Sequence, residues 1–98
     1  MQRDRIVDFI DRYLGSGNVK DASQNGLQVE GKSEVKKIVF GVSASLELFK
    51  RAAAAGADMV IVHHGLFWGK SVPVKGPFRK KLEALLANGI TLAAWHLP

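Results

Sequence analysis

Apolar residues near the N-terminus repeat at the spacing of one helix face. They recur every three or four positions, the pattern of an amphipathic helix, at Ile6, Phe9, Ile10, Tyr13 and Leu14. Residues 15–18, GSGN, favour an end to this helix, because glycine readily adopts the left-handed conformation found at helix ends. Beyond them, Asn25-Gly26 predicts a turn, and residues 27–29 alternate between apolar and polar like a short strand.

A second segment, residues 43–58, predicts a helix with recognisable ends. Either Ser43 or Ser45 suits the N-cap, because a serine hydroxyl can accept a bond from a free backbone N–H of the first turn. Glu47 suits the positive end of the helix dipole, and Gly56 suits the position just beyond the last turn.

A third helix is predicted over residues 76–89. Pro77 fits the first turn, where its missing N–H would have no partner in any case, and Gly89 fits the end. The apolar stripe of this helix comprises Phe78, Leu82, Leu85 and Leu86.

Three runs rich in β-forming residues, at positions 36–42, 59–62 and 90–95, separate and follow these helices and predict strands. The run 59–62 contains no polar residue, which is typical of a strand covered on both faces. The expected order is an N-terminal helix, a short strand, and then β-α-β-α-β. Such alternation predicts an α/β fold with a mainly parallel sheet and right-handed crossovers.

Composition places further bounds on the protein. The chain has 98 residues, and we expect residues 1–98 to form a single α/β domain. The absence of cysteine excludes disulfides and cysteine-ligated zinc, so a metal ion would need His, Asp, Glu or backbone oxygen. The sequence shows neither the apolar core of a signal peptide nor a membrane-spanning run of about 18 apolar residues. A cytoplasmic location is therefore expected.

Positive charge is concentrated in one part of a chain whose net charge is +5. The cluster comprises Lys70, Lys75, Arg79, Lys80 and Lys81. Such a cluster can bind nucleic acid or another anion. It is also the ordinary composition of a solvated helix face with a charged neighbouring loop, and the sequence favours this second interpretation.

Two adjacent histidines, His63 and His64, follow the buried run 59–62. In open α/β sheets, ligands bind beyond the carboxyl ends of the strands, which is where this pair lies. Neighbouring residues of a straight strand point to opposite faces, so we expect a bend, which Gly65 would permit, to bring both rings to one site. Imidazole is the commonest metal-ligating side chain. Alternatively, the rings are loop residues, or one is a hydrogen-bonded core residue.

The residues alone do not complete a metal site, because two histidines are too few ligands for tight binding. Asp58 is expected at the opposite end of the strand, whereas Asp21 and Glu30 cannot be placed. Other kinds of site have less support. The chain contains no G-x-S-x-G elbow, no P-loop and no G-x-G-x-x-G after a strand.

Three long segments carry a family resemblance: NGLQVEG (residues 25–31), GADMVIVHHGLFW (56–68) and WHLP (95–98). In this order and spacing they resemble the NIF-three-like family, whose bacterial members are called GTP cyclohydrolase I type 2 homologues. The resemblance extends over the whole chain. It implies a NIF-three-like α/β fold and a dinuclear-metal protein that assembles as a toroidal homo-hexamer.

The resemblance also implies a role for the histidine pair. His63 and His64 match the family's paired histidine ligands, one to each of two divalent metal ions. Two neighbouring ions activate a water and hold a displaced oxygen, which suits hydrolysis. Nitrogen and carboxylate ligands together admit zinc, iron, manganese, cobalt or nickel.

The family's remaining ligands have no counterpart in this sequence. They are an aspartate shortly after the HLP segment, and a histidine and a glutamate in a C-terminal half. The chain also ends on an apolar strand without a polar tail. We therefore expect residues 1–98 to be the N-terminal portion of a longer two-part protein, with an incomplete site and with exposed apolar surface.

Four other residues are candidates for positions around the metal ligands. His96 follows the last apolar run, and we expect it to lie behind the ligands or to bond to backbone. Gln28 is expected either to line the cleft or to belong to a structural turn and edge strand. For Phe67 and Trp68, packing or an interface is favoured over stacking on a substrate.

Three functions are open at this point. The first is a metal-dependent hydrolase acting on a nucleotide-like or phosphorylated small molecule. The second is a toroidal nucleic-acid-associated protein, which steeply salt-dependent binding would support. The third is a metal carrier or scaffold without catalysis, which measurements of turnover would separate from the first.

Overall fold

The computed structural model describes residues 1–97, so Pro98, the last residue of the WHLP segment, lies outside the described residues. The elements in chain order are α1 (Arg3–Leu14), a 3₁₀ turn η1 (Ser16–Asn18), β1 (Gly26–Val29), β2 (Ile38–Ser43), α2 (Leu46–Ala54), β3 (Met59–His64), α3 (Gly76–Ala87) and β4 (Thr91–Ala94). This is the element order predicted from the sequence.

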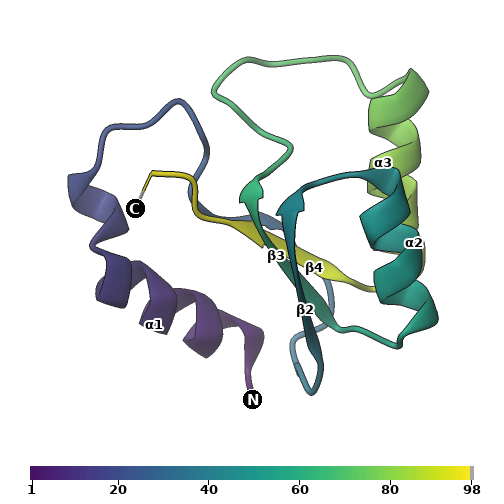
Figure 1. Cartoon of the computed structure of the whole chain (residues 1–98), viewed down its shortest axis with the longest axis horizontal. Coiled ribbons are helices and arrows are strands. Elements are labelled where there is room, and N and C mark those ends of the chain that lie inside the picture. The colour runs from purple at the N-terminus through teal and green to yellow at the C-terminus, as the bar shows by residue number, and fades with distance from the viewer. Residues whose placement is uncertain (98) are drawn as a thin grey trace.

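The strands form one sheet in the order β1-β4-β3-β2 (Figure 1). β2, β3 and β4 are parallel neighbours, and β1 pairs with β4 in the antiparallel direction. The predicted α/β class with a mainly parallel sheet is therefore confirmed. Because β2, β3 and β4 are parallel, their carboxyl ends lie along one edge of the sheet, and the connections that follow them meet there.

The predicted helix boundaries are confirmed by their local geometry. Ser45 is the N-cap of α2, since its hydroxyl accepts a bond from Leu48 N at 3.1 Å, while Ser43 is the last residue of β2. Pro77 lies in the first turn of α3. Gly15, directly after α1, has a φ of 65°, the left-handed conformation that favours glycine.

The main core lies between one face of the sheet and the helices α2 and α3 (Figure 1). Its fully buried members include Phe49, Val60, Leu85, Ile90 and Leu92. The stripe predicted for α3 is one residue too wide, because Leu86 is 61% exposed. The contact of α3 with the core is narrow, and Leu86 is a rotation of about 100° away from Leu85 around the helix.

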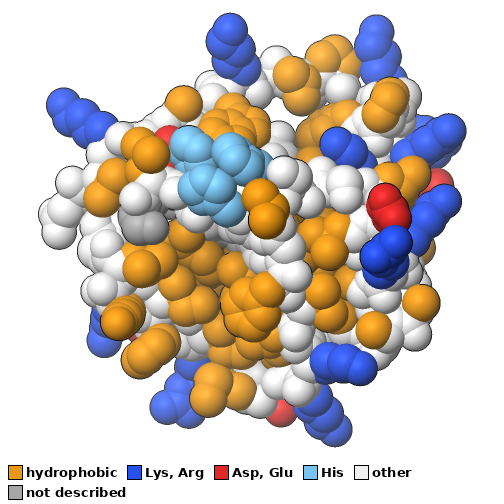
Figure 2. All heavy atoms as spheres, in the orientation of Figure 1, with side chains coloured by type: hydrophobic (Ala, Val, Ile, Leu, Met, Phe, Trp, Pro, Cys, Tyr) orange, Lys and Arg blue, Asp and Glu red, His pale blue; other side chains and the backbone are white. Residues whose placement is uncertain are grey.

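The opposite face of the sheet is only partly covered. α1 packs there through a small cluster containing Ile6, Val35 and Met59. The apolar stripe predicted for α1 is thus buried at one end only, since Tyr13 is 74% exposed. On β2, Phe40 is 72% exposed on the same open face. Figure 2 shows hydrophobic side chains gathered on the face below the histidines, so apolar surface is exposed as expected.

Candidate metal centre

The histidine pair closes β3, which runs through His64 rather than stopping before the histidines. The two imidazole rings are 4.4 Å apart between centroids, at 69° to each other, and both side chains are exposed. The strand ends before Gly65, which does not take a positive φ, in contrast to Gly69 at 88°. The two rings approach each other while both residues remain in the strand.

Gly65 is required for space. A Cβ atom at this position would collide with the side-chain amide of Gln28. That amide is fixed in place, because its Oε1 accepts from Leu66 N at 2.8 Å and its Nε2 donates to Gln24 O at 2.8 Å. Gln28 therefore braces the loop that follows the two histidines.

A register shift in the sheet explains how Gln28 reaches this loop. The pairing of β1 with β4 slips between Leu27 and Val29, so Gln28 occupies a bulge, which re-aims its side chain. Gln28 also lines a surface cavity of about 320 Å³ together with Phe67 and Lys70. The structural interpretation of this residue is thus confirmed, and a role in lining the cleft of the metal site stays a prediction.

His96 joins the pair from the end of the neighbouring strand β4. Its ring stacks on that of His63 at 4.6 Å and 28°, and its centroid is 5.1 Å from that of His64. One nitrogen from each of the three rings lies within 4.8 Å of the other two. The parallel alignment of β3 and β4 brings these residues together although 32 positions separate His64 from His96.

Trp68 forms one wall of this three-histidine cluster. Its ring lies 4.9 Å from that of His96 and 6.0 Å from that of His64, and its Nε1 donates to Gly65 O at 3.1 Å. Phe67 instead packs against the main core and meets the ring of Phe78 edge to face at 5.7 Å. The packing role predicted for Phe67 is thereby confirmed.

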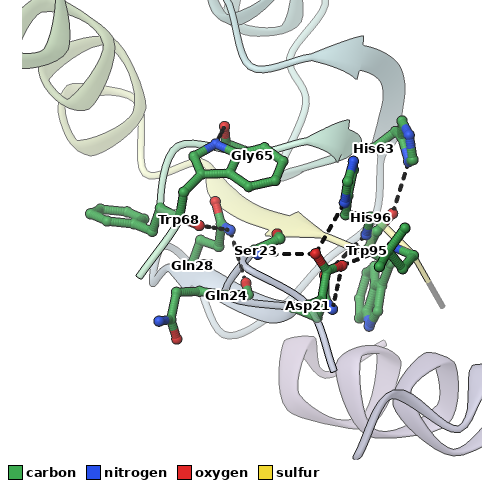
Figure 3. Close-up of polar contacts among 12 residues, drawn as sticks. Asp21, Ser23, Gln24, Gln28, His63, Gly65, Trp68, Trp95 and His96 are labelled. Atoms are coloured by element: carbon green, nitrogen blue, oxygen red, sulfur yellow. Dashed lines mark hydrogen bonds and ion pairs between the residues drawn. The ribbon is translucent and has the colours of Figure 1, made fainter. Parts of the chain in front are cut away.

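A carboxylate that the sequence could not place, Asp21, contacts the cluster. Its Oδ1 lies 3.1 Å from Nδ1 of His96, and its side chain is only 4% exposed (Figure 3). Burial raises the pKa of Asp21. Hydrogen bonds donated by Ser23 N, Leu97 N, Asn25 and His96 outweigh burial, so that the pKa lies well below its ordinary value. Asp21 is therefore ionised at neutral pH.

A weak sequence signal for this arrangement exists in retrospect. An aspartate whose side chain accepts from the backbone N–H two residues later forms an Asx-turn, and Ser23 N donates to Asp21 at 3.2 Å. The segment DASQN, residues 21–25, carries that signature. This signature predicts a local turn, but it does not predict that Asp21 contacts the imidazole of His96, 75 positions away.

The other carboxylates considered lie away from the histidines. Asp58 precedes β3 at the amino end of the sheet, as predicted, and accepts from Lys36 N and Lys37 N. Glu30 is near Arg3, with 3.6 Å between Oε2 and the guanidinium. Within the basic cluster, Arg79 pairs with Glu83 in the next turn of α3. Nucleic-acid binding by this cluster stays a prediction.

The donor set suits a transition-metal ion. Imidazole nitrogen favours zinc, copper, iron and nickel over magnesium and calcium. The hydrogen bond between Nδ1 of His63 and Trp95 O, at 3.4 Å, requires Nδ1 to donate, which leaves Nε2 of the neutral ring free to bind. Two nitrogens on one tetrahedral zinc are about 3.3 Å apart. Rings whose nitrogens spread over as much as 4.8 Å must close to share one ion, whereas two ions need no such closure.

Comparisons with known proteins give consistent matches. The family model Duf34/NIF3 (NGG1p interacting factor 3) matches residues 1–98. A "GTP cyclohydrolase 1 type 2 homolog" of Pyrococcus abyssi is 50% identical over the whole chain, which covers 39% of that protein. A homologue of the same name from Escherichia coli K12 is 50% identical, with 40% of its length covered.

Solved structures agree with these matches. One described as "Structural genomics, protein ybgI, unknown function" superimposes with a TM-score of 0.96 at 49% identity, and the chain covers 40% of it. The chain thus spans about two fifths of the length of these relatives. In residues 1–97, no helix is long and apolar enough to cross a membrane.

Proposed function

Because this chain belongs to the Duf34/NIF3 family, we propose that it holds divalent metal ions at the carboxyl edge of its sheet and contributes to a metal-dependent hydrolase. Membership of the family confirms the resemblance predicted from the sequence motifs. The similarity of the chain to relatives named GTP cyclohydrolase 1 type 2 homolog supports a hydrolytic reaction. A name of that kind does not by itself establish chemistry, so the proposal depends on the residues.

The convergence of three imidazoles at one edge of the sheet carries this proposal. His63 and His64 serve as ligands, one to each of two ions, and the support for this is that their rings lie side by side, with centroids 4.4 Å apart. The chain covers about two fifths of its relatives. In the proposed site, the remaining ligands come from a further part of a longer protein. A bound pair of divalent ions supplies an activated water and charge stabilisation.

The residues of this chain hold and shape the site. Gln28 fixes the loop after the histidines through its bonds to Gln24 O and Leu66 N, and Trp68 limits the access of water on one side. Lys70 lines the neighbouring cavity and offers a positive charge to a phosphate. The proposed substrate is accordingly a nucleotide-like or phosphorylated small molecule.

The proposal extends to assembly as a toroidal homo-hexamer. The exposed apolar side chains of Phe40 on the open face of the sheet and of Tyr13 on α1 support it, since apolar patches are usually covered. The same face is available to the remainder of a longer chain.

Turnover against a panel of phosphoesters and cyclic nucleobase compounds tests the proposed function. In a protein that also carries the remaining ligands, we expect hydrolysis that requires added Zn²⁺, Mn²⁺, Fe²⁺, Co²⁺ or Ni²⁺ and falls at least 100-fold in His64→Ala. Residues 1–98 alone should show weak turnover or none. Lys50→Ala, an exposed residue of α2 outside the site, is the matched control and keeps the parent rate. Metal binding without turnover of any compound would instead support the carrier or scaffold function.

A further inference from the structure

The Asp21 carboxylate is fully occupied by hydrogen-bond donors. Oδ1 accepts from Ser23 N at 3.2 Å and lies 3.1 Å from His96 Nδ1. Oδ2 accepts from Leu97 N at 2.9 Å and from Asn25 Nδ2 at 3.2 Å. Figure 3 shows the carboxylate between the turn that carries Ser23 and the ring of His96.

This arrangement decides where His96 carries its proton. An ionised carboxylate can only accept hydrogen bonds. The contact of 3.1 Å between Oδ1 of Asp21 and Nδ1 of His96 therefore requires the proton on Nδ1. In the neutral ring, the lone pair is then on Nε2, the nitrogen that a metal ion can bind.

From this geometry we propose that Asp21 is a positioning residue that fixes His96 as its Nδ1–H tautomer and offers Nε2 as a third nitrogen ligand beside His63 and His64. This inference rests on the proposed metal-binding function. It assigns His96 to direct ligation, whereas the sequence predicted a place behind the ligands or a bond to backbone. The imidazole of His96 is already oriented before an ion binds, because the Asp21 carboxylate and the stacked ring of His63 hold this imidazole in place.

His63 follows the same rule with a different acceptor. Its Nδ1 faces the carbonyl oxygen of Trp95, which also can only accept, so Nε2 of His63 is free as well. Trp95 precedes His96 directly in the chain. The end of β4 therefore fixes the tautomers of two rings, one through its own backbone and one through the Asp21 turn.

The substitution Asp21→Asn is predicted to reverse the tautomer. An amide has one accepting oxygen and one donating NH₂ group. If the amide oxygen takes the place of Oδ2, it keeps the bonds from Leu97 N and Asn25. The NH₂ group then takes the place of Oδ1, where it faces His96 and loses only the bond from Ser23 N. The opposite orientation loses two bonds. The substituted amide therefore donates to Nδ1 of His96, and the ring proton moves to Nε2, where it blocks ligation.

Long-range ¹H–¹⁵N NMR of the metal-free protein at a pH above the titration of histidine measures the tautomer directly. We expect a protonated Nδ1 and an unprotonated Nε2 for His96 in the parent chain. In Asp21→Asn, the two nitrogen shifts should exchange their character. Asp58→Asn is the matched control, because it makes the same change at a second carboxylate that accepts backbone bonds but faces no imidazole.

Zinc titration of the same three proteins, followed by calorimetry and by the Nε2 resonance of His96, tests the ligand role. Asp21→Asn should weaken zinc binding about 10–100-fold, and Asp58→Asn should leave it unchanged. In the parent chain, Nε2 of His96 should shift on binding.

Two outcomes would overturn the inference, and each points to a different step. An Nε2–H tautomer in the parent chain contradicts the positioning role of Asp21, and it does so even if Asp21→Asn fails to fold. Zinc that binds through His63 and His64 without shifting Nε2 of His96 contradicts the ligand role. If the tautomers are as predicted but no zinc binds to the parent, the proposed metal function fails while the assignment of the tautomer stands.

Discussion

The two ends of the parallel sheet each contain an aspartate that gathers backbone N–H groups, but only one of them faces an imidazole. At the amino end, Asp58 accepts from Lys36 N at 2.9 Å and Lys37 N at 3.1 Å, and its side chain is 15% exposed. At the carboxyl end, Asp21 accepts from two backbone groups and also faces His96.

The difference distinguishes a carboxylate that stabilises the fold, Asp58, from one that also contacts the candidate metal site, Asp21. The carboxylate of Asp58 ties the approach to β2 to the start of β3, and its remaining partner is the lysine Lys32 at 3.2 Å. Asp21 likewise accepts backbone hydrogen bonds that hold the loop before β1. One of its contacts, however, is with the imidazole of His96, whose second nitrogen is the proposed metal ligand. We infer that substitutions at the amino end change stability, while those at the carboxyl end change metal binding.

Added zinc gives the largest predicted effect, and it involves the carboxyl end alone. At a zinc concentration 100 times the dissociation constant, binding to the folded state adds about 2.7 kcal/mol to the free energy of unfolding. For a chain of this size, that raises Tm by about 10–20 °C. Differential scanning fluorimetry should show this rise in the parent chain and in Asp58→Ala.

The double variant His63→Ala/His64→Ala is the counterpart in this experiment. It should unfold at the same Tm with and without zinc. An equal rise in Tm for the double variant would place the bound zinc elsewhere and remove the contrast between the two ends.

Two glycines, one at each end, sharpen the comparison. A Cβ atom at Gly31, at the amino end, would lie 2.6 Å from Thr91 N, a backbone atom within the sheet. At Gly65, at the carboxyl end, it would meet the side-chain amide of Gln28, which can shift only by losing its bonds to Gln24 O and Leu66 N. Urea unfolding should therefore show a loss of about 2–3 kcal/mol for Gly31→Ala and a loss nearer ~1 kcal/mol for Gly65→Ala. A larger loss of stability for Gly65→Ala than for Gly31→Ala would contradict the view that backbone near Gly31 yields less than the Gln28 side chain near Gly65.

Removal of the Asp58 carboxylate gives a smaller change in stability. Asp58→Ala leaves Lys36 N and Lys37 N without their acceptor, which should cost about 1–2 kcal/mol in the free energy of unfolding. Asp58→Asn keeps an accepting oxygen for both groups and loses only the partly exposed pair with Lys32, so it should lose less than about 1 kcal/mol. Calorimetric zinc affinity should be unchanged in both variants, and a loss of affinity would show that the ends are coupled.

The dependence of stability on acid gives the smallest effect. The bond from Lys36 N lowers the pKa of Asp58, burial opposes it, and Lys32 and Lys37 lower it further. Because the folded pKa is below the ordinary 3.8, the unfolded chain binds more protons near that pH. The stability contributed by Asp58 is therefore present above pH 3.8 and is lost as pH falls through the folded pKa.

A comparison of parent and Asp58→Asn tests this sign. The gap in Tm between them should narrow as the pH is lowered from about 7 towards about 2, because the parent loses the charge that the variant never had. A gap that widens under acid would mean that the pKa of Asp58 is raised on folding.

The sequence predicted the elements well because their signals are local. Helix caps such as Ser45, the buried run before His63 and the glycine that ends α1 depend on neighbours within a few positions. The location of the histidine pair at the carboxyl edge followed from the β-α-β order alone. These features repeat in many chains, and the physics behind them acts over one or two turns.

The parts that could not be predicted depend on long-range contacts. The partner of Asp21 is 75 positions away, and no pattern around either residue names the other. The need for space at Gly65 was not predicted for the same reason, since the amide that excludes a side chain there comes from a bulge in β1. Tyr13 is exposed because the sheet contacts only one end of α1. The spacing of apolar residues in the sequence does not indicate how much of a helix is covered.

Metal content per chain tests the central claim most directly. Elemental mass spectrometry would be applied to tag-free protein never exposed to a chelator, with His63→Ala/His64→Ala prepared in parallel. We predict a transition metal in the parent chain and its loss in the double variant, with both proteins folded by circular dichroism. Equal metal content in the two proteins, or none in the parent, would contradict a metal centre built on the histidines at the carboxyl edge of the sheet.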